Sequence, residues 1–122
     1  MTTSGLNQRR VKPMKLELRK PLKSGIYSAV VVEVKPVETR FGAQLVWLFR
    51  LENEGRHTVR AYSSTAYTLK SKLGRWVQAC LGELPEELDT GRLAGTACLV
   101  DVDADGEYPR VKDVMPPENL FD

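Results

Sequence analysis

A chain of 122 residues with 42% hydrophobic and 28% charged side chains has the size and composition of one globular domain. It has no apolar run of about eighteen residues and begins with the polar MTTSGLNQRR, which argues against a membrane-spanning helix and a secretory signal and predicts a cytoplasmic protein. Its two cysteines, Cys80 and Cys98, fall in apolar segments and are expected to be buried thiols rather than a disulfide.

Charge is distributed unevenly along the chain, although the net charge is only +2. Residues 1–24 carry a net +6, residues 25–81 a net +4 and residues 82–122 a net −8. This asymmetry predicts one face that binds phosphates and another region that avoids them. The alternative is a basic disordered arm combined with an acidic end that only aids solubility.

Three regions are expected in chain order. Residues 1–13 are polar and basic and predict a flexible arm, residues 14–115 a folded domain, and residues 116–122 an extended acidic tail. Alternating apolar residues suggest a short extra strand at 14–18. Runs rich in β-branched and aromatic residues predict five further strands, at 25–35, 43–52, 56–64, 96–103 and 107–114.

Turns and loops are predicted between these strands. Residues 36–42 form a loop with Arg40 and Phe41 near its tip, and residues 53–55 and 104–106 form tight turns. The polar connector before the fourth strand is expected to contain one helical turn starting at Pro85.

The segment 64–82 predicts the principal helix, because its apolar residues recur at helical spacing. Ser64 or Thr65 is the expected N-cap, and Gly82 is the expected end. The apolar stripe consists of Leu69, Leu73, Trp76, Val77, Cys80 and Leu81.

Three strands, one helix and two strands, in that order, predict a mostly β protein with the OB-fold, a five-stranded barrel with one amphipathic helix between strands 3 and 4. One face of the second strand is entirely apolar and should lie in the core with Trp76. Its members are Leu45, Trp47, Phe49 and Leu51; Val59 and Ala61 of the third strand should also point inward, with Arg60 and Tyr62 outward.

Enzyme motifs are missing from the sequence. His57 is the only histidine, and Ser63 and Ser64 lie near it on alternating faces of one strand without the turn that a nucleophilic serine needs. A non-enzymatic protein without cofactor is therefore predicted.

The acidic residues of the fourth strand and the following turn match the start of a calcium-binding loop. Asp101, Asp103 and Asp105 precede Gly106, but the twelfth position is Lys112 rather than glutamate, and the flanks read as strands. An acidic hairpin turn is the favoured interpretation, with a weak cation site left open.

Aromatic and basic residues on an OB barrel suit single-stranded nucleic acid, because unstacked bases stack on aromatic rings while Lys and Arg neutralise phosphates. The groove of such a barrel lies over strands 2 and 3, bordered by the loops between strands 1 and 2 and between strands 4 and 5. The predicted nucleic-acid-binding residues are Arg40, Phe41, Gln44, Arg50, Arg60, Tyr62, Tyr108, Arg110 and Lys112, the last three on the fifth strand.

The pattern GIYSAVVVEVKPVETRFGAQLVWLFRL, the helix KSKLGRWVQACLG, and the strands LAGTACLVDV and EYPRVKDV resemble small OB-fold single-stranded-DNA-binding-like proteins of phages and bacteria. The resemblance covers roughly residues 14–115. It implies single-strand binding in replication, recombination or repair, and homo-oligomers.

The end of the chain is similar in character to the acidic C-terminal peptide with which bacterial single-stranded-DNA-binding proteins dock partner enzymes. It is short, and its last residue is Asp122 rather than Phe. The resemblance implies replication or repair proteins as partners of the tail. The competing hypothesis for the whole chain is an OB-type protein-interaction module that binds no nucleic acid and uses its acidic C-terminal third as the interface.

Overall fold

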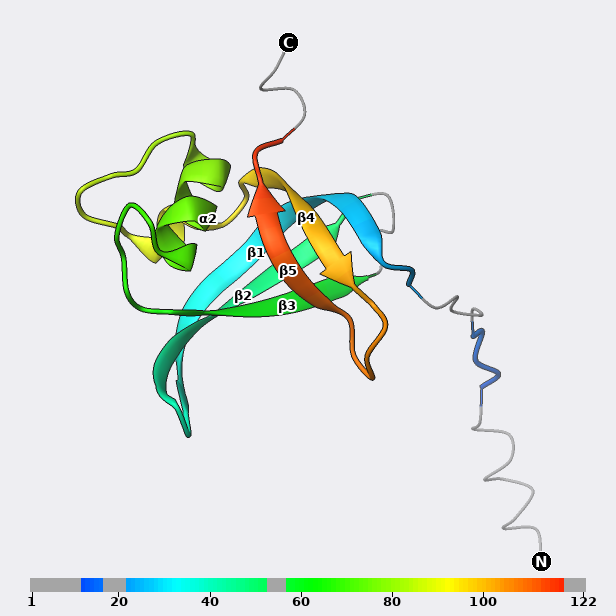
Figure 1. Cartoon of the computed structure of the whole chain (residues 1–122). Coiled ribbons are helices and arrows are strands. Elements are labelled where there is room, and N and C mark those ends of the chain that lie inside the picture. Colours follow the sequence, from blue (N-terminus) through cyan, green and yellow to red (C-terminus); the bar gives the residue numbers. More distant parts are fainter. Residues whose placement is uncertain (1–11, 17–21, 53–56, 118–122) are drawn as a thin grey trace, which may run out of the picture.

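Five strands and one α-helix make up the described chain, and the strands form a sheet that closes on itself (Figure 1). The computed structural model describes residues 12–16, 22–52 and 57–117. The strand order around the closed sheet is β1, β2, β3, β5, β4. The elements are β1 Gly25–Thr39, β2 Gly42–Leu51, β3 Thr58–Ser64, α2 Lys72–Leu81, the 3₁₀ helix η1 Thr90–Leu93, β4 Ala97–Asp103 and β5 Arg110–Met115. The predicted order of strands and helix is confirmed.

The first two strands form a long hairpin with a tighter turn than the sequence predicts. The loop expected at 36–42 is mostly strand, because β1 continues through Pro36 and leaves only Arg40 and Phe41 in the turn. β4 pairs with β1 only as far as Val30, so within the described chain β1 is an edge strand at Pro36. An edge position tolerates a residue that has no N–H to donate.

The sheet closes through a narrow seam between β3 and β5. β2 and β3 are paired along their length, whereas β3 and β5 run parallel and share a single register pair, Arg60 opposite Arg110. β1 reaches both β2 and β4, and its pairing with β2 shifts register between Val31 and Glu33. A shift of this kind bends and twists a strand, which helps one strand serve two neighbours.

Three aromatic side chains fill the centre of the closed sheet. Trp47 and Phe49 of β2 and Trp76 of α2 are fully buried, and the Trp47 ring lies 5.3 Å from Trp76, edge to face, and 5.9 Å from Phe49. The indole N–H of Trp47 donates to the buried Ser63 hydroxyl at 3.0 Å. The predicted core faces of β2 and β3 are confirmed; of the stripe predicted for α2, Leu73, Trp76 and Val77 are buried, whereas Cys80 and Leu81 are only partly buried.

The helix begins later than the sequence predicts, with Ser71 as its N-cap in place of Ser64 or Thr65. The Ser71 hydroxyl accepts the Gly74 and Thr68 N–H groups, each at 3.0 Å, and donates to the Thr68 carbonyl. The Thr68 hydroxyl in turn accepts the Ser71 N–H at 3.1 Å. These reciprocal hydrogen bonds satisfy donors at the start of the helix and fix the point at which it begins.

Two further features of α2 follow from this start. Leu69, predicted on the apolar stripe, precedes the helix and is 77% exposed. The predicted end at Gly82 is confirmed: it has φ 77°, and its N–H donates to the Gln78 carbonyl at 2.8 Å.

Other boundaries also differ from the predictions. β5 starts at Arg110 rather than at residue 107, so Tyr108 lies in the β4–β5 connection and not on a strand. The helical turn expected from Pro85 is instead η1, whose cap Asp89 accepts the N–H of Gly91 at 2.9 Å. The shift places Leu93 at zero exposure against the core.

Several predictions fall on residues outside the described ranges. They concern most of the basic arm 1–13, the turn at 53–55 and most of the tail 116–122. The suggested strand at 14–18 is not seen at 14–16, and residues 17–18 are not described. No helix in the described ranges is long and apolar enough to cross a membrane.

Candidate nucleic-acid interface

A hollow of about 870 Å³ lies over the seam between β3 and β5. Its walls come from β3, from β5 with the connection that precedes it, and from the first residue of α2. The lining residues are Thr58, Val59, Arg60, Ala61, Tyr62, Lys72, Tyr108, Pro109, Arg110, Val111 and Lys112. The hollow follows from the topology, because two parallel strands joined by one register pair leave the outer surface open between them.

Two tyrosines present exposed rings to this hollow. Tyr62 alternates with the buried Ala61 and Ser63 on β3 and is 47% exposed, and Tyr108 in the β4–β5 connection is 75% exposed. They come from opposite sides of the seam. Exposed aromatic rings of this kind can stack on bases or other flat ligands.

Four basic side chains line the same hollow. Arg60, Arg110 and Lys112 are exposed on β3 and β5, and Lys72 enters from the first turn of α2. The Lys72 ammonium donates to the Tyr62 carbonyl at 3.0 Å and lies 4.7 Å from the ring centre of Trp76. Lys72 thus connects the hollow to the buried aromatic core.

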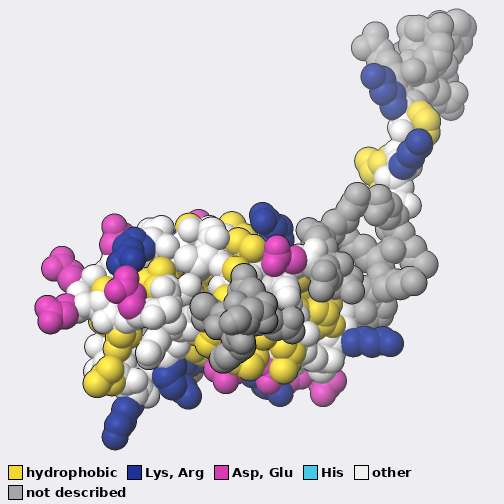
Figure 2. All heavy atoms as spheres, turned by 90° about the horizontal axis from the view of Figure 1, so that it is seen from above, with side chains coloured by type: hydrophobic (Ala, Val, Ile, Leu, Met, Phe, Trp, Pro, Cys, Tyr) yellow, Lys and Arg dark blue, Asp and Glu magenta, His cyan; other side chains and the backbone are white. Residues whose placement is uncertain are grey.

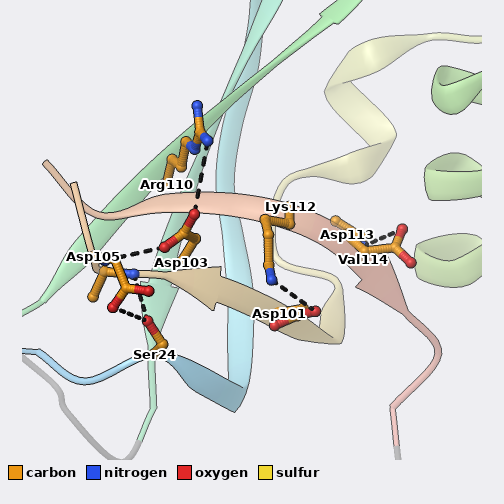
Figure 3. Close-up of polar contacts among 9 residues, drawn as sticks. Ser24, Asp101, Asp103, Asp105, Arg110, Lys112, Asp113 and Val114 are labelled. Atoms are coloured by element: carbon orange, nitrogen blue, oxygen red, sulfur yellow. Dashed lines mark hydrogen bonds and ion pairs between the residues drawn. The ribbon is translucent and has the colours of Figure 1, made fainter.

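Two of these cations have carboxylate partners on β4 (Figure 3). Arg110 Nη2 lies 3.7 Å from Asp103 Oδ2, and Lys112 Nζ lies 3.9 Å from Asp101 Oδ2. Both pairs are partly exposed, so each stabilises the fold by no more than about 1 kcal/mol. They lower the positive potential of the hollow.

The acidic turn suggested as a calcium loop is held by bonds within the chain. Asp103 Oδ1 accepts the Asp105 N–H at 3.0 Å, and the Ser24 hydroxyl donates to Asp105 at 3.3 Å while accepting the Ala104 N–H at 2.9 Å. Across residues 12–16, 22–52 and 57–117, no group of three His, Cys, Asp or Glu side chains is placed to hold a metal ion.

Five of the nine predicted binding residues line the hollow: Arg60, Tyr62, Tyr108, Arg110 and Lys112. Arg50 lies beside it on β2, in register with the lining residue Thr58, and Gln44 lies farther along β2, in register with Ser64. The outer face of β2 and β3 thus continues from the hollow toward the β1–β2 hairpin.

Arg40 and Phe41 occupy the hairpin turn and lie apart from the hollow. Phe41 is 80% exposed, and the Arg40 guanidinium lies 5.6 Å from the centre of its ring. Val46 is the register partner of Tyr62, and the stretch from Phe41 in the turn to Val46 in β2 spans roughly 17 Å at the rise of an extended strand.

Among the basic residues that line the hollow, Lys72 is the one that the sequence does not predict. Its position off the apolar stripe indicates only that it is exposed, not what it faces. The hydrogen bond from Lys72 to the Tyr62 carbonyl depends on how α2 packs against β3.

The residues considered for catalysis have structural roles. Ser63 is buried and accepts the Trp47 indole N–H, and the His57 carbonyl accepts the Leu51 N–H at 3.1 Å. Both groups hold β2 and β3 together.

The two cysteines contact one another between α2 and β4 and are free thiols. The hydrogen bond from Cys98 lowers the pKa of the half-buried Cys80 thiol against the opposing effect of burial. The same hydrogen bond, together with burial, raises the pKa of Cys98. The prediction of thiols rather than a disulfide agrees with this arrangement.

Acidic side chains gather at another part of the surface. Figure 2 shows them at the end of the molecule that carries the connection between α2 and η1. Glu83, Glu86, Glu87 and Asp89 are all exposed in this connection. None of them lines the hollow.

Comparison with known proteins does not add to this geometry. No protein-family model matches the sequence, and no curated protein matches it significantly.

Proposed function

We propose that this chain is a non-enzymatic single-stranded DNA-binding protein of the OB-fold type that acts in replication, recombination or repair. The observation that carries the proposal is the hollow at the β3–β5 seam, where two exposed tyrosines and four cations face the same space. Stacking on the rings and neutralisation of phosphates by the cations are the two interactions that a single strand needs.

The strand order supports the OB-fold assignment. A closed sheet ordered β1, β2, β3, β5, β4 with its helix between β3 and β4 is what we expect of that fold. A bound DNA single strand would run from the hollow along the outer face of β2 and β3, past Arg50 and Gln44, toward Arg40 and Phe41.

The test is titration with oligo-dT, followed by intrinsic fluorescence at several salt concentrations, with duplex DNA as competitor. Lys72 lies over Trp76, so a phosphate that contacts this lysine should change tryptophan emission. We expect binding to weaken with salt by a log-log slope of about −0.7 per neutralised phosphate.

Substitution identifies the contact surface. Tyr62→Ala and Tyr108→Ala should each cost about 1 to 3 kcal/mol of binding free energy, the contribution of one stacked base. Phe41→Ala tests the hairpin in the same way. Ile26→Ala is the control, because Ile26 is 61% exposed on β1 and lines no part of the hollow. Unchanged affinity in both tyrosine variants would refute the stacking site.

A protein-interaction module without nucleic-acid binding is the second candidate, favoured by the exposed acidic residues between α2 and η1. Absence of oligo-dT binding at low salt, together with a stable protein partner that no longer binds when Glu86 and Glu87 are neutralised, would support it over the first.

A further inference from the structure

Arg60 and Arg110 lie on opposite sides of the seam. They are the register pair of β3 and β5, and both side chains are exposed on the wall of the hollow. Like charges on directly opposed residues of neighbouring strands destabilise a sheet. An anion between the two guanidinium groups would turn this repulsion into attraction.

Asp103 is held in place as the counter-ion of Arg110 (Figure 3). Its Oδ1 accepts the Asp105 N–H at 3.0 Å, while its Oδ2 faces Arg110 Nη2 at 3.7 Å. The Arg110 side chain is 74% exposed and that of Asp103 is 24% exposed, so the carboxylate is the more enclosed partner. The turn therefore keeps a negative charge beside the seam, while the Arg110 side chain is mostly exposed.

We propose that Arg60 and Arg110 form a subsite for one phosphate group of the bound strand, and that Asp103 occupies the anion position beside Arg110 until the phosphate displaces it. This inference rests on the proposed function for the identity of its ligand. A solvated ion pair costs little to separate, and a phosphate offers an arginine fork more charge and more acceptor oxygens than this carboxylate contact. Because Asp103 competes with the phosphate for Arg110, it weakens DNA binding and makes the affinity less dependent on salt.

The central test is Asp103→Asn. The asparagine oxygen can still accept the Asp105 N–H, so the turn is retained while the charge is removed. We expect oligo-dT to bind about three- to fivefold more tightly at low salt, the equivalent of one exposed ion pair, and the salt slope to steepen by up to about 0.7.

Glu83→Gln is the matched control. Glu83 pairs with Arg92 at 3.2 Å, both side chains are exposed, and neither lines the hollow, so the substitution makes the same change in net charge elsewhere. Its affinity for oligo-dT should stay within about twofold of the unsubstituted protein, because Glu83 pairs with Arg92 and with no cation of the hollow. An equal gain in both variants, or no gain in Asp103→Asn, would overturn the proposal.

Double substitution tests whether the effect passes through Arg110. Asp103→Asn should bring no gain in a chain that already carries Arg110→Gln. If Arg60 and Arg110 share one phosphate, Arg60→Gln and Arg110→Gln should also be non-additive in affinity. Additive losses would assign the two arginines to separate phosphates. Melting temperatures of all variants show whether each one folds.

Inorganic tripolyphosphate separates this proposal from the proposed function. It should raise the melting temperature of the Asp103→Asn chain more than that of the unsubstituted or Glu83→Gln chain. This result without oligo-dT binding would support the anion subsite and refute the DNA-binding role. Oligo-dT binding that is insensitive to Asp103→Asn would support the DNA-binding role and refute the anion subsite. If neither tripolyphosphate nor oligo-dT binds, both proposals are refuted.

Discussion

Gly74 shows how a single residue can carry opposite meanings in sequence and structure. From the sequence, a glycine inside a helix is expected to destabilise it, because replacing an interior glycine with alanine usually raises stability by roughly 1 kcal/mol. In the structure Gly74 is buried, and a Cβ at this position would lie 1.9 Å from the Thr68 carbonyl oxygen. The glycine lets the chain before α2 fold back onto its first turn.

Gly74→Ala should therefore destabilise the protein, by about 1 to 3 kcal/mol in the free energy of unfolding, because the added methyl group forces the Thr68–Ser71 hydrogen bonds apart. Urea denaturation measures the change. Gln78→Ala, exposed in the same helix, is the control and should leave stability nearly unchanged or slightly raised. A more stable Gly74→Ala protein would show that the close approach is not required.

At the scale of elements, the contact between α2 and β4 makes the two cysteines unequal. Cys98 donates a hydrogen bond to Cys80, so the pKa of Cys80 is lowered and that of Cys98 is raised. A lowered pKa yields thiolate at lower pH, and thiolate is the reactive form. Iodoacetamide should alkylate Cys80 before Cys98, with a rate that rises at lower pH than for a free cysteine, as site-resolved mass spectrometry can show.

Cys98→Ala provides the control for this prediction. Without the donor, burial of Cys80 is no longer opposed by the Cys98 hydrogen bond, so its pKa should rise and the alkylation profile should move to higher pH. An unchanged profile in a chain that still folds would contradict the assigned cause.

Elements differ in how much of them the sequence reveals. Alternation on β2 predicts its buried face correctly, because sheet geometry fixes side-chain direction with a period of two. The start of α2 could not be predicted in this way, since Ser64, Thr65 and Ser71 are all good caps and the choice depends on hydrogen bonds with Thr68. The end of β1 at Thr39 and the start of β5 at Arg110 depend likewise on pairing with a neighbouring strand.

The sequence predicts only the part of the candidate site that depends on local periodicity. Alternation along one strand identifies Arg60 and Tyr62 as outward-facing residues. Their position beside Tyr108, Arg110 and Lys72 depends on the closure of the sheet between β3 and β5 and on the packing of α2, which bring together residues far apart in sequence. No local pattern carries that information.

At the scale of the whole molecule, the most basic part of the chain lies outside the core that the structure describes. Among the described residues, the buried core runs from Ala29 to Val114. Residues 1–24 carry a net +6, whereas residues 82–122, which supply core residues from Leu93 to Val114, carry a net −8. Arg110 and Lys112 in the hollow are paired with Asp103 and Asp101, which weakens their attraction for a polyanion. Basic residues elsewhere in the chain should therefore add to the attraction.

Deletion of residues 1–13 should separate these two contributions. The melting temperature should be unchanged, because the polar sequence of residues 1–13 predicts an arm outside the folded domain. The deletion takes away Arg9, Arg10 and Lys12, so oligo-dT binding should weaken at low salt, and its log-log salt slope should become shallower by up to about 0.7 for each phosphate that the arm no longer neutralises. Replacing the same three residues by glutamine in the full-length chain should reproduce the effect if charge is the cause. Weaker binding confined to the deletion would assign the contribution to other residues of the arm, and a lowered melting temperature would show that the arm belongs to the folded domain.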